Sequence, residues 1–285
     1  MWKQLQSEYA AWLQSAGKAQ ATIIAYNKDI EQFVEFLQKM GKTHPSQVVS
    51  DDFGLYKGEL EQLRYTDKSI SRKLNSLKSF FRYLRKQEVI ADNPLQQVAH
   101  PKYKVSPPRI LSKTEYRALR DACRADQRMS AIIELLLQTG LRISELAALK
   151  LDNIHLNKKE LEIEPNGSHP ARMVPLNKSA IQAIQDYTKI RPRAKEATFF
   201  LTKSCRPFLV RNIRSAIDRY FRLAGIKDAK VNDLRHTFIV EQLGAGVPLV
   251  TVSQIVGHKR ISTTERYLQF LDLDTIQPDV TIREL

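Results

Sequence analysis

The chain has 285 residues, which is long for one compact core and enough for two domains, and its 42% of hydrophobic residues can bury a substantial core. No apolar run reaches the roughly 20 residues that a membrane helix needs, and the amphipathic start at Met1 is unlike a secretion signal, so we expect neither membrane insertion nor secretion. Lysine and arginine number 45 against 31 acidic residues, and this net charge of +14 favours a polyanionic partner, most commonly nucleic acid.

Residues 1–94 predict a helical N-terminal domain. Apolar residues recur at helical spacing over 2–13 and 23–37, with a glycine after each stretch. A short helix over 51–62 and a longer one over 67–87 complete four predicted helices.

The fourth predicted helix is strongly basic. Residues 68–86 contain seven basic residues and no acidic one, while apolar residues occupy the other side of the helix. A basic face is often only a solvated surface, but the absence of any acid over this length favours phosphate contact. The predicted nucleic-acid contacts on this helix are Lys68, Arg72, Lys73 and Lys78.

A segment over 95–110 is predicted to link two domains. Its three prolines fix their own φ and keep the residues before them extended. The segment contains no acid, and Lys102 and Lys104 are expected to follow the nucleic-acid backbone.

The second domain, 111–285, is predicted to be helix-rich with a small antiparallel sheet, so the fold class is mainly α. Ser112 begins a capping-box pattern ahead of its first helix. Strands over 161–164 and 172–176 flank the dipeptide Asn166-Gly167, which is typical of hairpin turns. The further predicted helices are 129–138, 143–149, 178–190, 209–224, 232–244, 248–256 and 262–271.

Composition also bears on compartment and cofactors. Cys123 and Cys205 lie far apart and outside any metal-ligand spacing, which is typical of idle thiols in a reducing cytoplasm. The chain contains no glycine-rich phosphate loop and no carboxylate cluster of metal-binding type. We therefore expect a cytoplasmic protein without a metal or a nucleotide cofactor.

Three segments far apart in the sequence hold the reactive residue types. They are 139–146 (TGLRISEL), 232–238 (NDLRHTF) and 257–267 (GHKRISTTERY). In this order they resemble the tyrosine recombinase, or phage integrase, family, which includes the lambda-type integrases and the Xer recombinases. The resemblance covers essentially the whole chain, because the helical N-terminal unit and the linker also fit.

The resemblance implies a C-shaped clamp on DNA. The helical core-binding domain would lie on one face of the duplex and the catalytic domain on the other. Four protomers would assemble as a homotetramer on two double-stranded recombination sites, each a core with inverted repeats. The apolar tail after residue 267 would dock on a neighbouring protomer. Such a protein would be bacterial or encoded by a mobile element.

Strand transfer to a phenol gives each reactive type a role. Negative charge grows on the phosphate oxygens, and the guanidiniums of Arg142 and Arg235 would offset it. His258 is expected to contact the scissile phosphate, and Tyr267 is the expected nucleophile. The ordinary alternatives are a surface ion pair with Glu145 for Arg142 and a packing role for the histidine and the tyrosine.

Two positions depart from the family pattern. Asn232 stands where the family has a histidine, and an amide cannot carry a proton. Asn166 falls where the family has the lysine that protonates the departing 5′ oxygen, a contribution typically worth about 10² to 10⁴-fold. We therefore expect a weakened or relocated acid. The candidate substitutes are His169 and Arg172, followed by Lys158 and Lys159.

Further basic residues are expected at the DNA. By position in the family, the helix over 209–224 would enter the major groove, and its arginines would contact either bases or phosphates. The predicted contacts in this domain are Arg206, Arg211, Arg214 and Lys259. His236 is expected either to pack structurally or to support the catalytic site.

Two other functions fit the same motifs. A relaxing enzyme of the type IB topoisomerase kind shares the arginine and tyrosine chemistry. A DNA-binding accessory protein with decayed catalysis would explain the two asparagines. An active recombinase is favoured, because decay would be expected to remove the nucleophile or the arginines as well.

Overall fold

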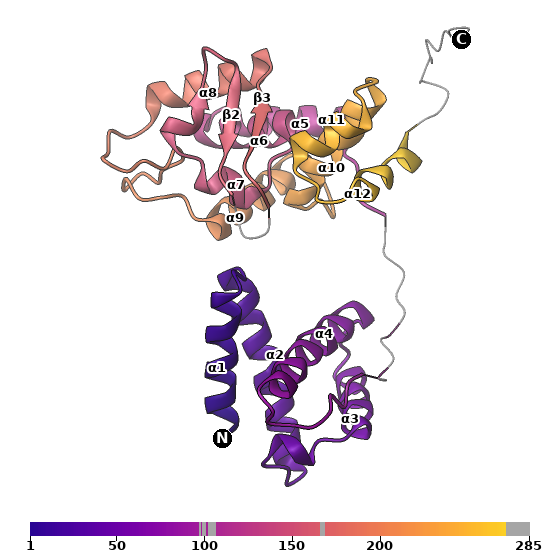
Figure 1. Cartoon of the computed structure of the whole chain (residues 1–285). Coiled ribbons are helices and arrows are strands. Elements are labelled where there is room, and N and C mark those ends of the chain that lie inside the picture. The colour runs from indigo at the N-terminus through magenta and orange to yellow at the C-terminus, as the bar shows by residue number, and fades with distance from the viewer. Residues whose placement is uncertain (97, 99–100, 102–106, 166–168, 272–285) are drawn as a thin grey trace, which may run out of the picture. The chain divides into compact units, whose positions relative to one another are not determined.

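The structure, a computed structural model, describes residues 1–96, 98, 101, 107–165 and 169–271. The chain forms two compact units, Met1–Ser106 and Pro107–Leu285, each with its own hydrophobic core (Figure 1). The division falls within the predicted linker, whose ends belong to the units: Leu95 is buried in the first core, and the adjoining Leu111 is buried in the second. No helix among the described residues is long and apolar enough to cross a membrane.

The described part of the N-terminal unit contains four helices, close to the predicted ones. They are α1 (Trp2–Ser15), α2 (Gln20–Lys39), α3 (Ser50–Gln62) and α4 (Asp67–Lys86), with a 3-10 turn, η1 (Pro45–Gln47), before α3. Aromatic rings fill the space between them. Phe33 stacks on Phe53 with ring centroids 4.8 Å apart, and Phe81 meets both rings edge-on, an arrangement that adds to the gain from burial.

A buried ion cluster in this unit corrects one sequence prediction. Asp29 on α2 is 2% exposed, and its carboxylate accepts hydrogen bonds from Arg72, Lys73 and Ser76 on α4. Lys73, a predicted DNA contact, is 3% exposed and also donates to Gln32. That prediction is wrong, because a buried carboxylate requires a paired cation and Lys73 meets this need inside the α2–α4 interface.

Helix α6 (Gln127–Thr139) is the centre of the C-terminal unit. Buried residues lie on almost all its sides, as expected for a helix surrounded by others. It contacts α5 (Lys113–Cys123), α7 (Ile143–Ala148), α8 (Lys178–Ile190), α9 (Val210–Leu223) and α10 (Val231–Gly244). Ser112 caps α5 through the predicted capping box with Glu115.

A small antiparallel sheet accompanies these helices, in the order β1-β2-β3. Figure 1 labels its strands β2 and β3. Its strands are β1 (Ile154–His155), which follows a 3-10 turn, η2 (Leu151–Asn153), then β2 (Glu160–Ile163) and β3 (Arg172–Pro175). The pair β2–β3 is the predicted one, with Leu161 opposite Val174. Strand β1 escaped prediction because two residues cannot show alternation. The predicted turn at Asn166-Gly167 lies outside the described residues.

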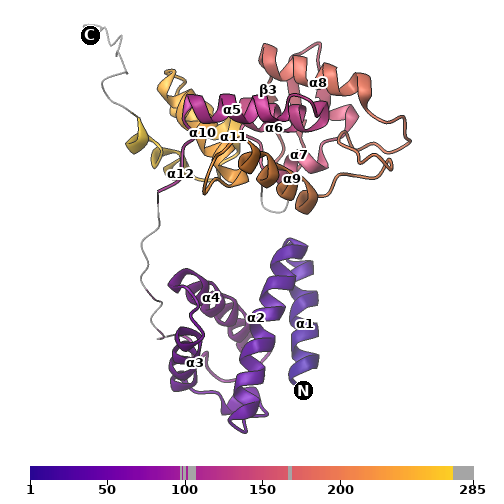
Figure 2. The ribbon, with the colours of Figure 1, turned by 180° about the vertical axis from the view of Figure 1, so that it is seen from behind.

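The last described segment differs from the helix predicted over 262–271. Helix α12 (Ser262–Glu265) ends before Tyr267, and a 3-10 turn, η3 (Leu268–Phe270), follows it. The amide of Tyr267 donates to the carbonyl of Thr264, three residues back, so the α-helical ladder of bonds four residues apart does not continue. The ring of Tyr267 instead packs in a small buried cluster with residues of α10 and α11 (Leu249–Val256), which lie beside α12 (Figure 2).

Gly140 is required where α6 ends. It adopts a left-handed conformation with φ +61°, and an added Cβ would lie 2.3 Å from Cδ1 of Phe238 on α10. Gly140→Ala should therefore lower the free energy of unfolding by about 2 to 5 kcal/mol, combining about 1 to 2 for the left-handed backbone with about 1 to 3 for overpacking. Urea unfolding of the variant measures this loss.

Gly246→Ala is the matched control for that loss. Gly246 has φ +80°, but nothing lies within 4 Å of an added Cβ, so only the backbone strain of about 1 to 2 kcal/mol should appear. Equal losses in the two variants would contradict a close approach to Phe238.

Candidate active site

Two predicted catalytic arginines meet at one backbone carbonyl. Arg142 is the N-cap residue of α7, and Arg235 lies on α10. Both donate to the carbonyl oxygen of Val256, Nη1 of Arg142 at 3.2 Å and Nη2 of Arg235 at 2.6 Å. Arg142 also donates to the carbonyl of Gly257 at 3.0 Å. These carbonyls lie at the end of α11 and have no partner within the helix. The guanidiniums supply their hydrogen bonds and stabilise the partial negative charge at the C-terminal end of the helix.

Glu145 supplies the carboxylate of this cluster. Its side chain is 2% exposed and accepts hydrogen bonds from Nη1 of Arg142 at 2.9 Å and from both terminal nitrogens of Arg172 at 3.0 and 2.7 Å. Burial by itself raises the pKa of Glu145, but the bonds from Arg172 and from the backbone and charge of Arg142 outweigh it and hold the pKa at about 2. Arg142 and Arg172 thus share one carboxylate, and Arg235 adds a third guanidinium through the Val256 carbonyl, so the net positive charge of the cluster suits an anion.

Gly257 allows Arg172 to approach Glu145. It ends α11 with φ +67°, and an added Cβ would lie 3.0 Å from Cζ of Arg172. Nε of Arg172 meanwhile donates to the carbonyl of Ile255 at 2.7 Å. A side chain at residue 257 would therefore push this guanidinium away from its partners. The glycine of the third segment thus has a packing reason within this site.

Arg235 and Arg142 differ in their access to solvent. Arg235 is 5% exposed, and burial, followed by the charge of Arg142, lowers its pKa from 12.5 to about 9. It remains charged at neutral pH, and backbone carbonyls replace part of its lost hydration, including that of Gly140 at 2.6 Å. The Arg142 side chain is 25% exposed. The pair can therefore offer one partly accessible guanidinium to an incoming anion.

The phenol of Tyr267 contacts a histidine. Oη of Tyr267 lies 2.7 Å from Nδ1 of His236, and Nε2 of His236 lies 2.8 Å from Nδ2 of Asn232, one turn earlier on α10. Tyr267 is 7% exposed, and burial raises its pKa above the ordinary 10.0, although the nearby charge of Arg235 opposes this. The phenol is therefore protonated at neutral pH and needs a base before it can act as a nucleophile.

His258 stacks on Tyr267. The ring centroids are 6.2 Å apart with planes at 15°, and Nδ1 of His258 lies 2.8 Å from Oγ1 of the buried Thr264. Burial, followed by the charge of Arg235, lowers the pKa of His258 to about 4, so the ring is neutral at neutral pH. With Nδ1 accepting the Thr264 hydroxyl, Nε2 carries the proton and can donate it to an external oxygen.

The candidate replacements for the hairpin lysine fall into different environments. Asn166 lies outside the described residues, as do Lys102 and Lys104. Arg172 is bound to Glu145 and 9% exposed, so its predicted use as an acid is replaced by a structural role. His169 has a buried Nδ1 without a hydrogen-bond partner among the described residues, and burial, followed by the charge of Arg142, lowers its pKa. The other two candidates, Lys158 and Lys159, lie in the turn between β1 and β2 and are exposed.

Sequence reasoning missed how much Glu145 and His236 contribute. The pair between Arg142 and Glu145 is visible in the sequence as residues three apart, and on that basis a surface ion pair is an alternative to a catalytic role for Arg142. The structure contains the pair, but Arg142 has five donors and also reaches two carbonyls, so the pair does not occupy it fully. Arg172 comes from a distant strand, and no local signal links it to Glu145.

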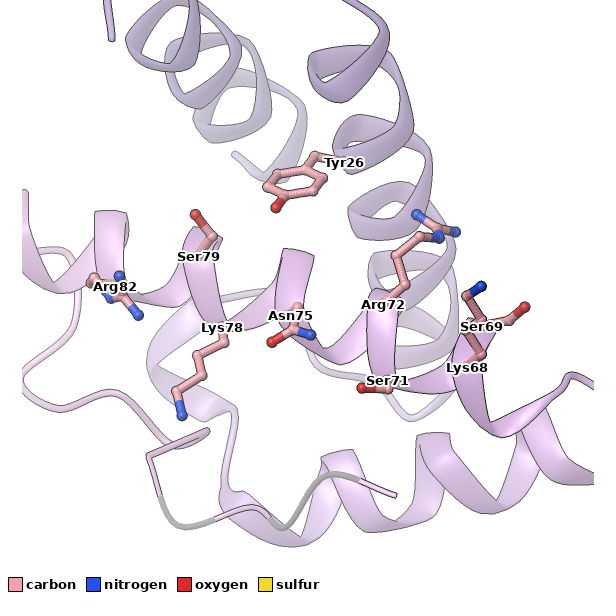
Figure 3. A pocket seen from close by; sticks show the side chains of 9 residues that line it. All are labelled: Tyr26, Lys68, Ser69, Ser71, Arg72, Asn75, Lys78, Ser79 and Arg82. Atoms are coloured by element: carbon pink, nitrogen blue, oxygen red, sulfur yellow. The ribbon is translucent and has the colours of Figure 1, made fainter. Parts of the chain in front are cut away.

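A basic groove lies on the N-terminal unit, between α2 and α4 (Figure 3). The groove has a volume of about 710 Å³, and its lining includes four cationic side chains and no acidic one. Lys68, Arg72 and Lys78 are three of these cations and were predicted from the sequence, while Arg82 was not among the predicted contacts. Tyr26 of α2 faces them across the groove. This surface has the charge expected of a phosphate-binding groove.

The remaining predicted DNA contacts are exposed. Arg206 precedes α9, Arg211 and Arg214 lie on its first turns, and Lys259 follows His258. Their exposure leaves their charges available to a partner, and their contact with DNA stays a prediction. Within the described residues, no group of three or more histidine, cysteine or acidic side chains could hold a metal ion.

Two family models match the chain. Residues 109–272 match the phage integrase family, and residues 7–88 match the N-terminal SAM-like domain of phage integrases. Together they cover both units and all the residues of the site described above. The chain therefore belongs to the phage integrase family of tyrosine recombinases.

The chain is similar to several XerC proteins and to solved integrases. It is 32% identical to the tyrosine recombinase XerC of Pelotomaculum thermopropionicum over 265 residues, 86% of each chain. It is 30% identical to XerC of Roseiflexus castenholzii over 259 residues, 86% of this chain and 82% of the relative. Its fold matches the Tn1549 transposon integrase, solved with a circular intermediate DNA, at a TM-score of 0.78 and 20% identity, covering 92% of this chain and 94% of the integrase.

Removing the charge of Glu145 should destabilise the C-terminal unit. Glu145→Gln leaves Arg172 buried without its carboxylate, and breaking a buried pair in this way costs about 3 to 5 kcal/mol. Because the folded pKa of about 2 lies below the ordinary 4.5, this contribution is complete above pH 4.5 and is lost as pH falls through about 2. Urea unfolding of both proteins at several pH values measures it.

Glu162→Gln on β2 is the control, because this carboxylate is 49% exposed and its loss should change stability by no more than about 0.5 kcal/mol. A Glu145→Gln variant as stable as this control at neutral pH would show that Glu145 does not hold the cluster.

Proposed function

We propose that this protein is a site-specific DNA recombinase that cleaves and rejoins duplex DNA through a 3′-phosphotyrosyl bond to Tyr267. The observation that carries this proposal is the meeting of Arg142 and Arg235 at the Val256 carbonyl, in the same small unit that holds Tyr267 between two histidines. Family membership supports the same chemistry. An accessory protein without catalysis would have no need of this preassembled set.

The proposed reaction uses the charges of the site directly. The partly accessible guanidinium of Arg142 binds a non-bridging oxygen of the scissile phosphate, and its charge together with that of the buried Arg235 offsets the charge that grows in the transition state. His258 donates a further hydrogen bond from Nε2. The phenolate of Tyr267 attacks phosphorus and the bond to the 5′ oxygen breaks, so the phosphotyrosine conserves the bond energy for rejoining. The reaction needs no nucleotide cofactor and, on this proposal, no metal.

The departing 5′ oxygen must receive a proton. His169 is the candidate acid of this proposal, because it lies close enough to Arg142 and Arg172 for their charges to lower its pKa, and its buried Nδ1 has no hydrogen-bond partner among the described residues. A bound phosphate would add negative charge beside His169 and so raise its pKa toward the range useful for proton donation. Asn232 takes no part in this proton transfer, since an amide cannot carry a proton.

The proposed substrate is duplex DNA bearing inverted repeats around a core. The groove with Lys68, Arg72 and Lys78 would contact one side of the duplex, and the arginines at the start of α9 would contact the major groove. We propose that the two units enclose the DNA as a clamp and that four protomers act on two sites. The segment after Tyr267 would join neighbouring protomers. The setting would be the cytoplasm of a bacterium, from a chromosomal or mobile-element gene.

A nicked suicide substrate tests the proposed function. The duplex carries an inverted repeat that the protein itself selects from random DNA, with a nick that releases the cleaved end. We expect the wild type to form a protein–DNA adduct stable to detergent, with the adduct at Tyr267 by mass spectrometry, and Tyr267→Phe to form none. Tyr187→Phe, at a buried tyrosine away from the site, should retain the adduct.

The absence of an adduct with wild type would overturn the proposed function. Relaxation of a supercoiled plasmid that lacks the selected repeat, as fast as one that contains it, would indicate a topoisomerase instead.

Lys78 and Lys73 should differ in DNA binding. Both lie on α4, but Lys78 lines the groove and Lys73 is bound to Asp29. Lys78→Met should weaken duplex binding and reduce the slope of log affinity against log salt by about 0.9, one phosphate contact. Lys73→Met should leave that slope unchanged. Fluorescence anisotropy at several salt concentrations measures both, and equal slopes for the two variants would contradict the assignment.

A further inference from the structure

The contact between His236 and Tyr267 has the form of a base poised on its nucleophile. The separation of 2.7 Å between Nδ1 and Oη is a full hydrogen bond, and both groups are held in place. His236 is fixed on the first turns of α10, and the ring of Tyr267 is buried against α10 and α11. Geometry of this kind is the first requirement for proton abstraction.

Asn232 determines which nitrogen of His236 holds the proton. The structure places Nδ2 of its side chain 2.8 Å from Nε2 of His236, and in this orientation the amide donates, so that Nδ1 carries the imidazole proton. A half-turn of the amide group puts Oδ1 in the same place; Nε2 then donates its proton to that oxygen, and the lone pair of Nδ1 is left to accept the phenol proton. The proposed base is the His236 tautomer of this second orientation. An amide cannot carry a proton, but its orientation can determine the tautomer of a neighbouring histidine.

We propose that His236 is the general base that takes the proton from Tyr267, and that Asn232 is the positioning residue that orients His236. The proposal rests on the proposed function, because it concerns the step that makes the phosphotyrosyl bond. It assigns a base to a chain in which asparagine stands at the family's histidine position.

The step balances in both directions. As Oη of Tyr267 bonds to phosphorus, its proton moves to Nδ1 of His236, and the bond between phosphorus and the 5′ oxygen breaks. The 5′ oxygen takes a proton from the acid and leaves as a hydroxyl. In rejoining, that hydroxyl attacks phosphorus and returns its proton to the acid, and the proton on His236 returns to the phenol as the phosphotyrosyl bond breaks.

Burial keeps His236 unprotonated before the reaction. Burial lowers its pKa below the ordinary 6.5, Asp233 on the same helix opposes this, and Arg235 adds to it. The other titratable groups facing it are His258 and Tyr267. A neutral imidazole can accept a proton at neutral pH, whereas the raised pKa of Tyr267 makes unassisted loss of its proton rare.

The decisive experiment lowers the pKa of the phenol itself, so that it needs less help from a base. His236→Gln keeps the size and a hydrogen-bonding group but not the base, and it should slow adduct formation on the suicide substrate by about 10² to 10⁴-fold. Replacing Tyr267 by 3,5-difluorotyrosine, a more acidic phenol, in the His236→Gln protein should then restore about tenfold or more of that loss. The same replacement in the wild type should have a much smaller effect.

The pH profile gives a second readout that a packing role would not change. In the wild type, adduct formation should be constant near neutral pH and fall only in acid, below 6.5, as His236 becomes protonated. In His236→Gln this acid limb should disappear and the rate should rise with pH up to the raised pKa of the phenol. His258, with a pKa of about 4, titrates at a lower pH than this limb.

Asn232 variants test the positioning role. Asn232→Asp retains an oxygen that accepts from Nε2, so it should keep most of the wild-type rate. Asn232→Leu removes the acceptor and should slow adduct formation by about tenfold, roughly the contribution of one hydrogen bond. His155→Gln, at a histidine on β1 outside the site, is the control and should match the wild type.

These outcomes separate the inference from the function on which it rests. A wild type that forms no adduct removes the proposed function. If the wild type forms the adduct, two results overturn only the assignment of the base. One is a His236→Gln variant as fast as the wild type. The other is a slow His236→Gln variant whose rate is the same with tyrosine and with difluorotyrosine at position 267. A rate for Asn232→Leu equal to that of the wild type overturns the positioning role. Thermal unfolding of each variant near the wild-type midpoint confirms that these rates belong to folded protein.

Discussion

The contact of Glu145 with Arg142 and Arg172 is the interaction on which the rest of the site depends. It joins the start of α7, strand β3 and, through the carbonyls of Ile255, Val256 and Gly257, the end of α11. A buried carboxylate with a pKa of about 2 remains charged at all physiological pH values, so the anchor does not release its arginines. Arg235, on α10, donates to the carbonyls of Gly140 and Val256 and has no carboxylate partner among the described residues.

This imbalance of charge connects structure to chemistry. A site with as many carboxylates as guanidiniums would be internally neutral and would gain little from a phosphate. Here one carboxylate holds the geometry, and the remaining positive charge is left for the substrate. Burial lowers the pKa of His258, and the same positive charge adds to this effect, while at Tyr267 it opposes the rise in pKa that burial causes. The arginines thus bias the nearby proton-handling groups before any DNA is bound.

The sequence predicted most of this arrangement where the signal is local. Helical periodicity, the Ser112 capping box and the apolar strands determine their own elements, and the reactive residues stand in motifs with fixed spacing. Long-range partners were not predictable: Asp29 draws Lys73 into the N-terminal core, and Glu145 binds Arg172 from a distant strand. The helix predicted through Tyr267 also failed, because tertiary packing of that ring outweighs the helical period. Such partners depend on which surfaces meet, and periodicity does not contain that information.

The central claim is that Arg142 serves to offset phosphate charge, and a neutral substrate tests it most directly. A methylphosphonate at the scissile position replaces one non-bridging oxygen by a methyl group and removes the negative charge. On the ordinary diester, Arg142→Ala should form the Tyr267 adduct about 10²-fold or more slowly than the wild type, the scale seen for loss of one charge-stabilising donor. On the methylphosphonate, the two proteins should react at similar rates. An equal deficit of Arg142→Ala on both substrates would contradict the account.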